Sequence, residues 1–126
     1  MKYNRKKDSG FWKLARVYLH DYMPVVKNLS DKSVETYKQS LKTYLKFLGE
    51  IKWLSNEKVT FDAFSRDNIK EYISWLKEQG FSPKSINLKL TAIRSFLKYC
   101  SEEDFELRGI YTEVCSVNVA RVEMFR

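Results

Sequence analysis

Large apolar residues recur at intervals of three and four positions in four stretches of the chain, and this spacing predicts four amphipathic helices. The first stretch covers residues 11–23 and stops at Pro24, which lacks the backbone N–H that a helix interior requires. The second stretch covers residues 34–48. It follows an N-cap sequence at residues 28–31 and ends at Gly49, where glycine commonly closes a helix.

The third and fourth stretches are bounded by the same kinds of signal. Ser65 is placed to cap the third helix and Gly80 to close it. Ser82 and Pro83 follow at once as an N-cap and a first helical residue, so the fourth helix opens there and runs to about Ser101. The sequence therefore predicts an all-α protein built as a four-helix bundle.

Three segments lie outside the predicted bundle of residues 11–101. Residues 50–64 show no sustained period and are predicted to form a loop whose aromatic side chains cap the core, with a short strand as the alternative. Residues 1–10 are predicted to be a flexible basic arm. Residues 102–126 begin with an acidic cluster, show no helical pattern, and are interpreted as a connector to a further segment. The apolar residues of this connector are scattered: Ile110, Val114, Val117, Val119 and Val122.

The composition is that of a folded globular protein, with 44% hydrophobic and 31% charged residues in a chain of 126. No apolar run approaches the roughly 20 residues that span a bilayer, and the basic start leads into charged sequence, unlike a signal peptide. We therefore expect a cytoplasmic protein whose two cysteines, Cys100 and Cys115, are thiols. The one histidine, His20, has no companions at zinc-binding spacing, so we predict no metal and no cofactor.

The formal net charge of +7 is unevenly distributed over the predicted helices. The second helix has no acidic residue between Glu35 and Glu50, and the fourth has none at all up to Ser101, whereas the third mixes both signs. On a helical wheel the sides of the second and fourth helices opposite the apolar stripe carry mainly lysines, hydroxyls and an amide, with Asn87 and Arg94 on the flank of the fourth. Such side chains contact phosphates and base edges of nucleic acids. The alternative is that these lysines are simply solvated.

These two faces supply the predicted contacts with double-stranded DNA. On the second helix the residues are Lys32, Ser33, Thr36, Gln39, Lys42, Thr43 and Lys46. On the fourth helix they are Lys84, Ser85, Asn87, Leu88, Thr91, Arg94, Ser95 and Lys98.

Two runs of sequence carry a resemblance to a known family. The first reads Ser30-x-x-Ser33-x-x-x-Tyr37-x-x-x-Leu41-x-x-Tyr44-x-x-Phe47-Leu48. The second reads Ile69-x-x-Tyr72-Ile73-x-x-Leu76, then Gly80-x-Ser82-x-x-Ser85-Ile86-Asn87-Leu88-Lys89-Leu90-Thr91-Ala92-Ile93-Arg94-Ser95-Phe96. The stretch from residue 11 to about 101 resembles the N-terminal core-binding (SAM-like) domain of tyrosine recombinases of the phage integrase type. Leu88 departs from the basic residue often found in the family, which argues against a guanine contact there and leaves contact with a thymine methyl.

The resemblance implies a domain that forms one jaw of a clamp around duplex DNA, with its second and fourth helices approaching adjacent major grooves. It implies sequence-selective binding to one recombination half-site, together with other recombinase protomers in a tetramer, in a protein encoded by a bacterium or a phage. Cleavage through a 3'-phosphotyrosyl intermediate belongs to a catalytic domain, toward which residues 102–126 would lead. The H-x-x-R motif of that domain is absent, because Met23 stands three residues after His20, so we expect no catalytic residue in this chain.

Several conspicuous side chains are interpreted as structural. Tyr37 and Tyr44 fall on the apolar stripe of the second helix, and Cys100 is interpreted as a small apolar filler. The large aromatic residues are assigned to the core or its rim, although one exposed near the first helix would suit docking of a neighbouring protomer: Trp12, Trp53, Trp75 and Phe96. The acidic residues from 102 to 106 are interpreted as a solvated helix end.

Two other functions compete with DNA binding in recombination. A helical protein–protein interaction module would have the same basic faces, merely solvated, and would depend on exposed apolar residues such as Leu88. A free-standing helix-turn-helix regulator is disfavoured by the long connection between the second and third helices.

Overall fold

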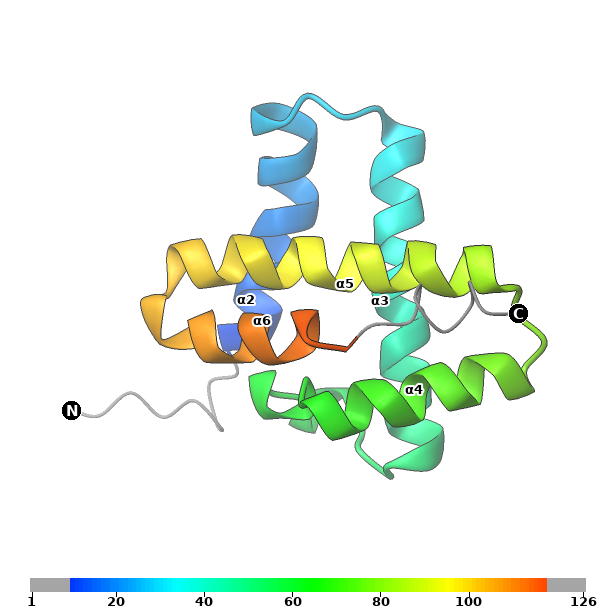
Figure 1. Ribbon diagram of the computed structural model, residues 1–126. Coiled ribbons are helices and arrows are strands. Elements are labelled where there is room, and N and C mark those ends of the chain that lie inside the picture. The colour runs from blue at the N-terminus through cyan, green and yellow to red at the C-terminus, as the bar shows by residue number, and fades with distance from the viewer. Residues whose placement is uncertain (1–9, 118–126) are drawn as a thin grey trace. The chain divides into compact units, whose positions relative to one another are not determined.

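The computed structural model describes residues 10–117, and these contain helices and no strand (Figure 1). They form two compact units, one ending at Ala63 and the other beginning at Phe64. The first unit holds α2 (Gly10–Val17), the π-helix η1 (Tyr18–Val26), α3 (Asp31–Ile51) and the short 3₁₀ turns η2 (Asn56–Lys58) and η3 (Phe61–Ala63). The second unit holds α4 (Arg66–Glu78), α5 (Pro83–Glu103), η4 (Phe105–Leu107) and α6 (Arg108–Cys115). The all-α prediction is confirmed, and the alternative of a short strand in residues 50–64 is wrong.

The first helix does not stop at Pro24 as predicted. α2 passes directly into η1, which contains Pro24 and extends to Val26. In an α-helix the proline ring would press against the carbonyl four residues earlier. In the wider π turns the donors bond five residues back, as the Lys27 amide does to the Tyr22 carbonyl at 2.8 Å, so the helix continues past the proline.

The start of α3 was predicted correctly and its end was not. Ser30 is the N-cap, and its hydroxyl accepts a hydrogen bond from the Ser33 amide at 3.2 Å. The helix runs two residues past Gly49, and the left-handed conformation expected there occurs at Trp53, whose φ is 58°. A Cβ placed on Gly49 would meet only the Leu54 carbonyl oxygen, at an ordinary 3.8 Å, so nothing in the packing requires glycine at this position.

The loop after α3 packs onto the helices of the first unit, as the sequence predicted. The buried Tyr44 hydroxyl donates a 2.6 Å hydrogen bond to the Ala63 carbonyl, and the Trp12 indole N–H donates to the Asn56 carbonyl at 3.0 Å. The rings of Phe11 and Phe61 meet edge to face with centroids 5.6 Å apart. Together these contacts hold both 3₁₀ turns in place.

Among the aromatic residues assigned to the core or rim, Trp53 is the exception. Trp75 and Phe96 are buried and Trp12 is half-buried, which confirms their assignment. The Trp53 side chain is 88% exposed because it lies on the left-handed residue that turns the chain away from the end of α3. The prediction that the aromatic residues of this loop cap the core is therefore wrong for Trp53, whereas Phe61 and Phe64 are buried as predicted.

The three helix boundaries predicted at Ser65, Gly80 and Ser82 are confirmed. Ser65 caps α4 by accepting from the Asn68 amide, and Gly80 follows the helix with a φ of 93°. Ser82 caps α5 by accepting from the Ser85 amide, with Pro83 as its first residue.

The prediction that residues after 101 lack a helix is wrong. α5 extends to Glu103, and a 3₁₀ turn then leads into α6, which lies beside α5 within the second unit (Figure 1). The predicted basic arm lies almost entirely outside the described residues, as do Val119 and Val122 of the predicted connector.

Candidate nucleic-acid interface

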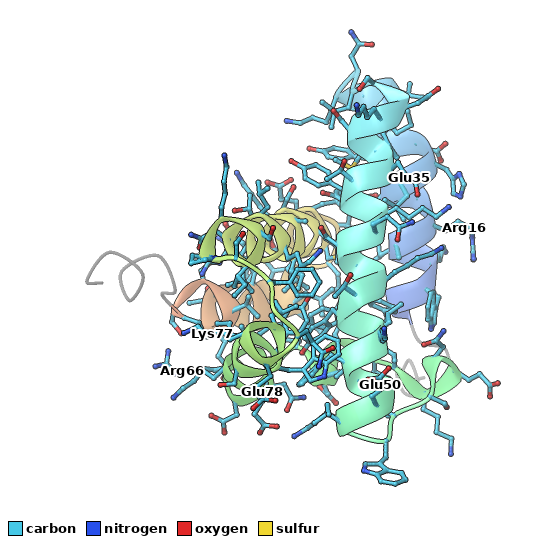
Figure 2. The ribbon with its side chains drawn as sticks, turned by 90° about the vertical axis from the view of Figure 1, so that its right-hand side faces the viewer. Arg16, Glu35, Glu50, Arg66, Lys77 and Glu78 are labelled. Carbon is cyan, nitrogen blue, oxygen red and sulfur yellow. The ribbon has the colours of Figure 1, made fainter. Side chains whose placement is uncertain are left out.

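The outward face of α3 is polar and carries its acidic residues at the helix ends. Figure 2 shows Glu35 and Glu50 at opposite ends of the helix, and the sequence between them has no carboxylate. Of the seven predicted contact residues on this helix, Thr43 is half-buried and the other six are exposed: Lys32, Ser33, Thr36, Gln39, Lys42 and Lys46. The face is accessible as predicted.

Most polar groups on this face are bonded within the helix. The Thr36 and Thr43 hydroxyls donate to the carbonyls four residues earlier, at 3.1 and 2.9 Å. The Gln39 amide donates to Glu35 at 2.7 Å, and the Lys46 ammonium lies 4.0 Å from the Glu50 carboxylate. The exposed lysine charges are therefore what α3 chiefly offers to a ligand.

The predicted core side of α5 is confirmed, since Ile86, Leu90, Ile93 and Leu97 are all buried. The opposite stripe has four exposed residues at helical spacing: Lys84, Leu88, Thr91 and Lys98. The other four predicted residues are half-buried on its flanks: Ser85, Asn87, Arg94 and Ser95. The central stripe of the predicted set is thus accessible, while the flanking residues are only partly so.

One cation of α5 that the sequence prediction left out is turned toward an aromatic ring. The Lys89 ammonium lies 4.9 Å from the centroid of the Phe81 ring, and partial burial lowers the pKa of Lys89. Lys89 lies in the stretch of α5 without acidic residues, and that stretch is the sequence signal that could have identified it.

Arg94 differs from the other predicted residues because its guanidinium is bonded inside the second unit. It donates to the Val117 carbonyl, and its Nε is buried with no hydrogen-bond partner among the described residues. From α4, the Arg66 guanidinium donates to the Ser116 hydroxyl at 2.6 Å, and the Arg66 amide donates to the Glu113 carboxylate at 3.2 Å. Two arginines thus bind the carboxyl end of α6, where helix carbonyls lack partners and carry partial negative charge.

A groove that the sequence did not predict lies where α5 meets η4 and α6. Its volume is about 460 Å³. It is lined by Lys98, Ser101, Glu102, Phe105, Arg108, Tyr111 and Thr112. The Arg108 guanidinium lies over the exposed Phe105 ring at 4.9 Å, and a hydrogen bond with the Cys115 side chain raises the pKa of Tyr111. This mixture of cations, a carboxylate and hydroxyls marks a polar groove at the end of the exposed α5 stripe.

α4 provides the contrast within the same unit. Its exposed side alternates in sign, with Asp67 and Glu71 beside Lys70, and Figure 2 shows Lys77 and Glu78 extending outward near its end. Mixed charges of this kind are typical of a solvated surface helix. Basic charge without acidic neighbours is therefore a property of particular helices in this chain.

The remaining candidate side chains have structural or solvated positions. His20 is exposed, and residues 10–117 contain no cluster of three or more His, Cys, Asp or Glu side chains suited to a metal ion. Both cysteines are free thiols. Cys100 is fully buried in the core, which confirms its interpretation as an apolar filler, and this burial raises its pKa. No helix in the described part of the chain is long and apolar enough to cross a membrane.

Similarity to known protein families identifies the family of this chain. Residues 18–104 match the phage integrase N-terminal SAM-like domain. The chain belongs to this family. All fifteen predicted contact residues, from Lys32 to Lys98, lie inside the matched region of the integrase domain, whereas α6 lies beyond its end.

Similar proteins of known name are tyrosine recombinases. XerD of Vibrio cholerae is 30% identical over 83 residues, covering 66% of this chain and 26% of that protein. XerD of Oceanobacillus iheyensis is 29% identical over 82 residues, or 65% of this chain and 26% of that protein. XerC of Listeria innocua is 26% identical over 94 residues, or 75% and 30%. This integrase-family chain thus spans about a quarter of the length of its XerD relatives. No solved structure is significantly similar to it.

Proposed function

We propose that this chain binds double-stranded DNA through the exposed faces of α3 and α5, as the core-binding domain of a site-specific tyrosine recombinase. The observation that carries the proposal is the exposed α5 stripe, where Lys84 and Lys98 flank Thr91 and Leu88 on a helix without a carboxylate before Glu102. An α-helix fits the major groove, and such a stripe reaches base edges at its centre and phosphates at its ends. Membership of the integrase family supports the same function.

The two faces have different roles in this proposal. Lys32 and Lys42 of α3 neutralise phosphates and fix the register of the domain on the duplex. On α5, Asn87 and Thr91 contact base edges and give sequence preference. Arg94 can contact a base edge only if its guanidinium gives up the hydrogen bond to the Val117 carbonyl and donates to DNA instead.

The proposed domain binds without cleaving. The sequence lacks an H-x-x-R motif, because Met23 follows His20 where the arginine would stand, and no tyrosine lies in such a setting. We place the domain on one recombination half-site in the cytoplasm, beside other recombinase protomers in a tetramer. Its partners are DNA and protein, with no role for a metal or a membrane.

Titration of duplex DNA at several salt concentrations tests this function. Each lysine that neutralises a phosphate should contribute about 0.9 to the slope of log affinity against log salt. Lys84→Ala with Lys98→Ala should therefore lower that slope by about 1.8. The matched control is Lys70→Ala, which removes an exposed lysine from the mixed-charge face of α4 and should leave the slope unchanged.

The proposal fails if wild-type protein shows no affinity for duplex DNA at low salt. It also fails if the α5 double variant and the α4 control lower the slope equally per lysine, since the basic charge would then act without a defined face. Loss of partner-protein binding in Leu88→Ala, with no DNA affinity in wild type, would favour a protein-interaction module.

A further inference from the structure

Leu88 is the exposed large apolar side chain of α5. Its side chain is 58% exposed, whereas the other large apolar residues of the helix are buried in the second unit. Those buried residues are Ile86, Leu90, Ile93, Phe96, Leu97 and Tyr99. Packing within the second unit therefore does not use the Leu88 side chain.

The neighbours of Leu88 are polar and cationic. Lys84 lies one turn before it and Thr91 one turn after it, both exposed, and Ser85 and Asn87 flank it half-buried. Phe81, two residues before α5, is also exposed, and the Lys89 ammonium lies over its ring. A protein partner would be expected to bury a contiguous apolar patch. On α5 itself, one exposed apolar side chain among lysines, hydroxyls and an amide is instead complementary to the major groove, where phosphates and polar base edges surround isolated methyl groups.

We infer that Leu88 is a specificity residue that packs against the 5-methyl group of thymine in the major groove, while its polar neighbours contact the adjacent bases and phosphates. This inference rests on the proposed DNA-binding function and adds the base that the helix prefers. Thymine is the base that presents a methyl group in that groove, whereas cytosine has only hydrogen at that ring position and presents an amino donor where thymine has its carbonyl oxygen. A leucine gains nothing from the amino group and would leave it without a hydrogen-bond partner.

The expected effect follows from the burial of one methyl group. Transfer of such a group out of water corresponds to a change of about two- to fourfold in affinity, depending on how completely Leu88 covers it. Two adjacent thymines contacted by the branched end of the side chain would roughly square that ratio.

The test compares thymine with uracil, which lacks only the methyl group. A random-sequence duplex library is enriched on wild-type protein and then amplified with either dTTP or dUTP, and the dissociation constants of both pools are measured. Wild type should bind the thymine pool at least about twofold more tightly. Leu88→Ala should bind both pools equally, as should Leu88→Asn, which keeps the branched shape of the side chain and replaces its two methyl groups with an amide.

A matched control lies outside both faces. Val25→Ala removes exposed methyl groups from η1, and it should keep the thymine preference. The inference is overturned if wild type binds both pools equally, or if Leu88→Ala retains the full preference, because the difference would then come from DNA shape. Failure of wild type to bind either pool would overturn the proposed function itself. Equal thermal unfolding of the variants confirms that the fold is intact.

Discussion

On the exposed side of α3 the hydroxyls of Thr36 and Thr43 are bonded to the helix backbone, whereas on α5 the side chains of Asn87 and Thr91 have no hydrogen-bond partner within residues 10–117. The two faces have similar compositions, with lysines, threonines and an amide on each. They differ in how many of those groups remain available to a ligand.

This difference suits α3 to providing affinity for DNA and α5 to providing sequence selectivity. A threonine whose hydroxyl hydrogen is given to its own helix has less to offer a base edge, while a neighbouring lysine keeps its charge. α3 is thus suited to positioning the domain on the phosphates. α5 retains unbonded polar groups and an apolar tip between two lysines, which suits it to reading bases.

Charge reversal on both faces gives the largest expected effect. Lys84→Glu with Lys98→Glu should weaken duplex binding by about 100-fold near 0.1 M salt, because two phosphate contacts are lost and two repulsions are added. Lys32→Glu with Lys42→Glu should weaken it similarly, because both faces are proposed to hold phosphates. Fluorescence anisotropy on a common labelled duplex measures both.

The matched control for the first unit is Lys13→Glu, which reverses an exposed charge on α2 and should change affinity little. If only one of the two double variants lost affinity, the other helix would have no part in the interface. The comparison between the two faces would then have no functional meaning.

Arg94→Ala tests whether the flank of α5 serves folding or base reading. The guanidinium holds the Val117 carbonyl at the carboxyl end of α6, so its loss should lower the free energy of unfolding by about 2 kcal/mol. Hydrogen exchange of the α6 amides should rise at the same time. Chemical denaturation followed by circular dichroism measures the stability.

Lys98→Ala is the control for Arg94, since it removes a cation one turn further along α5 that is exposed. It should leave the stability within about 0.5 kcal/mol of wild type. Were Arg94→Ala to keep full stability and lose only DNA preference, the residue would belong with Asn87 and Thr91 instead.

Substitutions of the polar groups should show which helix selects the sequence. Asn87→Ala and Thr91→Ala should each reduce the ratio of specific to mismatched binding by about tenfold, the usual size of one base-edge contact. Gln39→Ala on α3 should leave the ratio unchanged, because its amide is bonded to Glu35. Competition between enriched and random duplexes measures the ratio. Equal losses for all three variants would mean that α3 also reads bases.

The sequence predicted the parts of this fold that depend on local chemistry. Ser65 and Ser82 cap their helices, Gly80 takes the left-handed conformation, and the apolar stripe of α5 is buried as the wheel required. Caps and stripes are encoded within a few residues, so they are readable without the tertiary structure. For the same reason the accessible sides of both candidate helices were predictable.

Features that depend on distant residues were not predictable in this way. α6 has eight residues and no side-chain cap, and helices this short are marginal by themselves. It is held by Arg66 from α4 and by Arg94 from α5, and this pairing has no local signature. The helix ends predicted at Pro24 and Gly49 were wrong for a related reason. A π-helix continues past Pro24, and α3 extends two residues past Gly49, so neither residue ends its helix.

The smallest expected effect distinguishes two lysines of the same face. Lys42→Ala should weaken binding to every duplex by up to about eightfold near 0.1 M salt, without changing sequence preference, because a phosphate contact is lost. Lys46→Ala should weaken it less, because the Lys46 ammonium already lies 4.0 Å from Glu50 and gives up part of that pairing on binding. Anisotropy titrations against several unrelated duplexes measure both effects.

Glu50→Gln tests whether the Glu50 carboxylate reduces the contribution of Lys46 to DNA binding. With the carboxylate removed, the Lys46 charge is fully available, so Lys46→Ala in this background should weaken binding as much as Lys42→Ala does in wild type. Glu50→Gln alone should slightly strengthen binding, since a negative charge leaves the end of the face. If Lys46→Ala had the same small effect on affinity in both backgrounds, Lys46 would lie outside the phosphate contacts. The positioning role of α3 would then rest on Lys32 and Lys42.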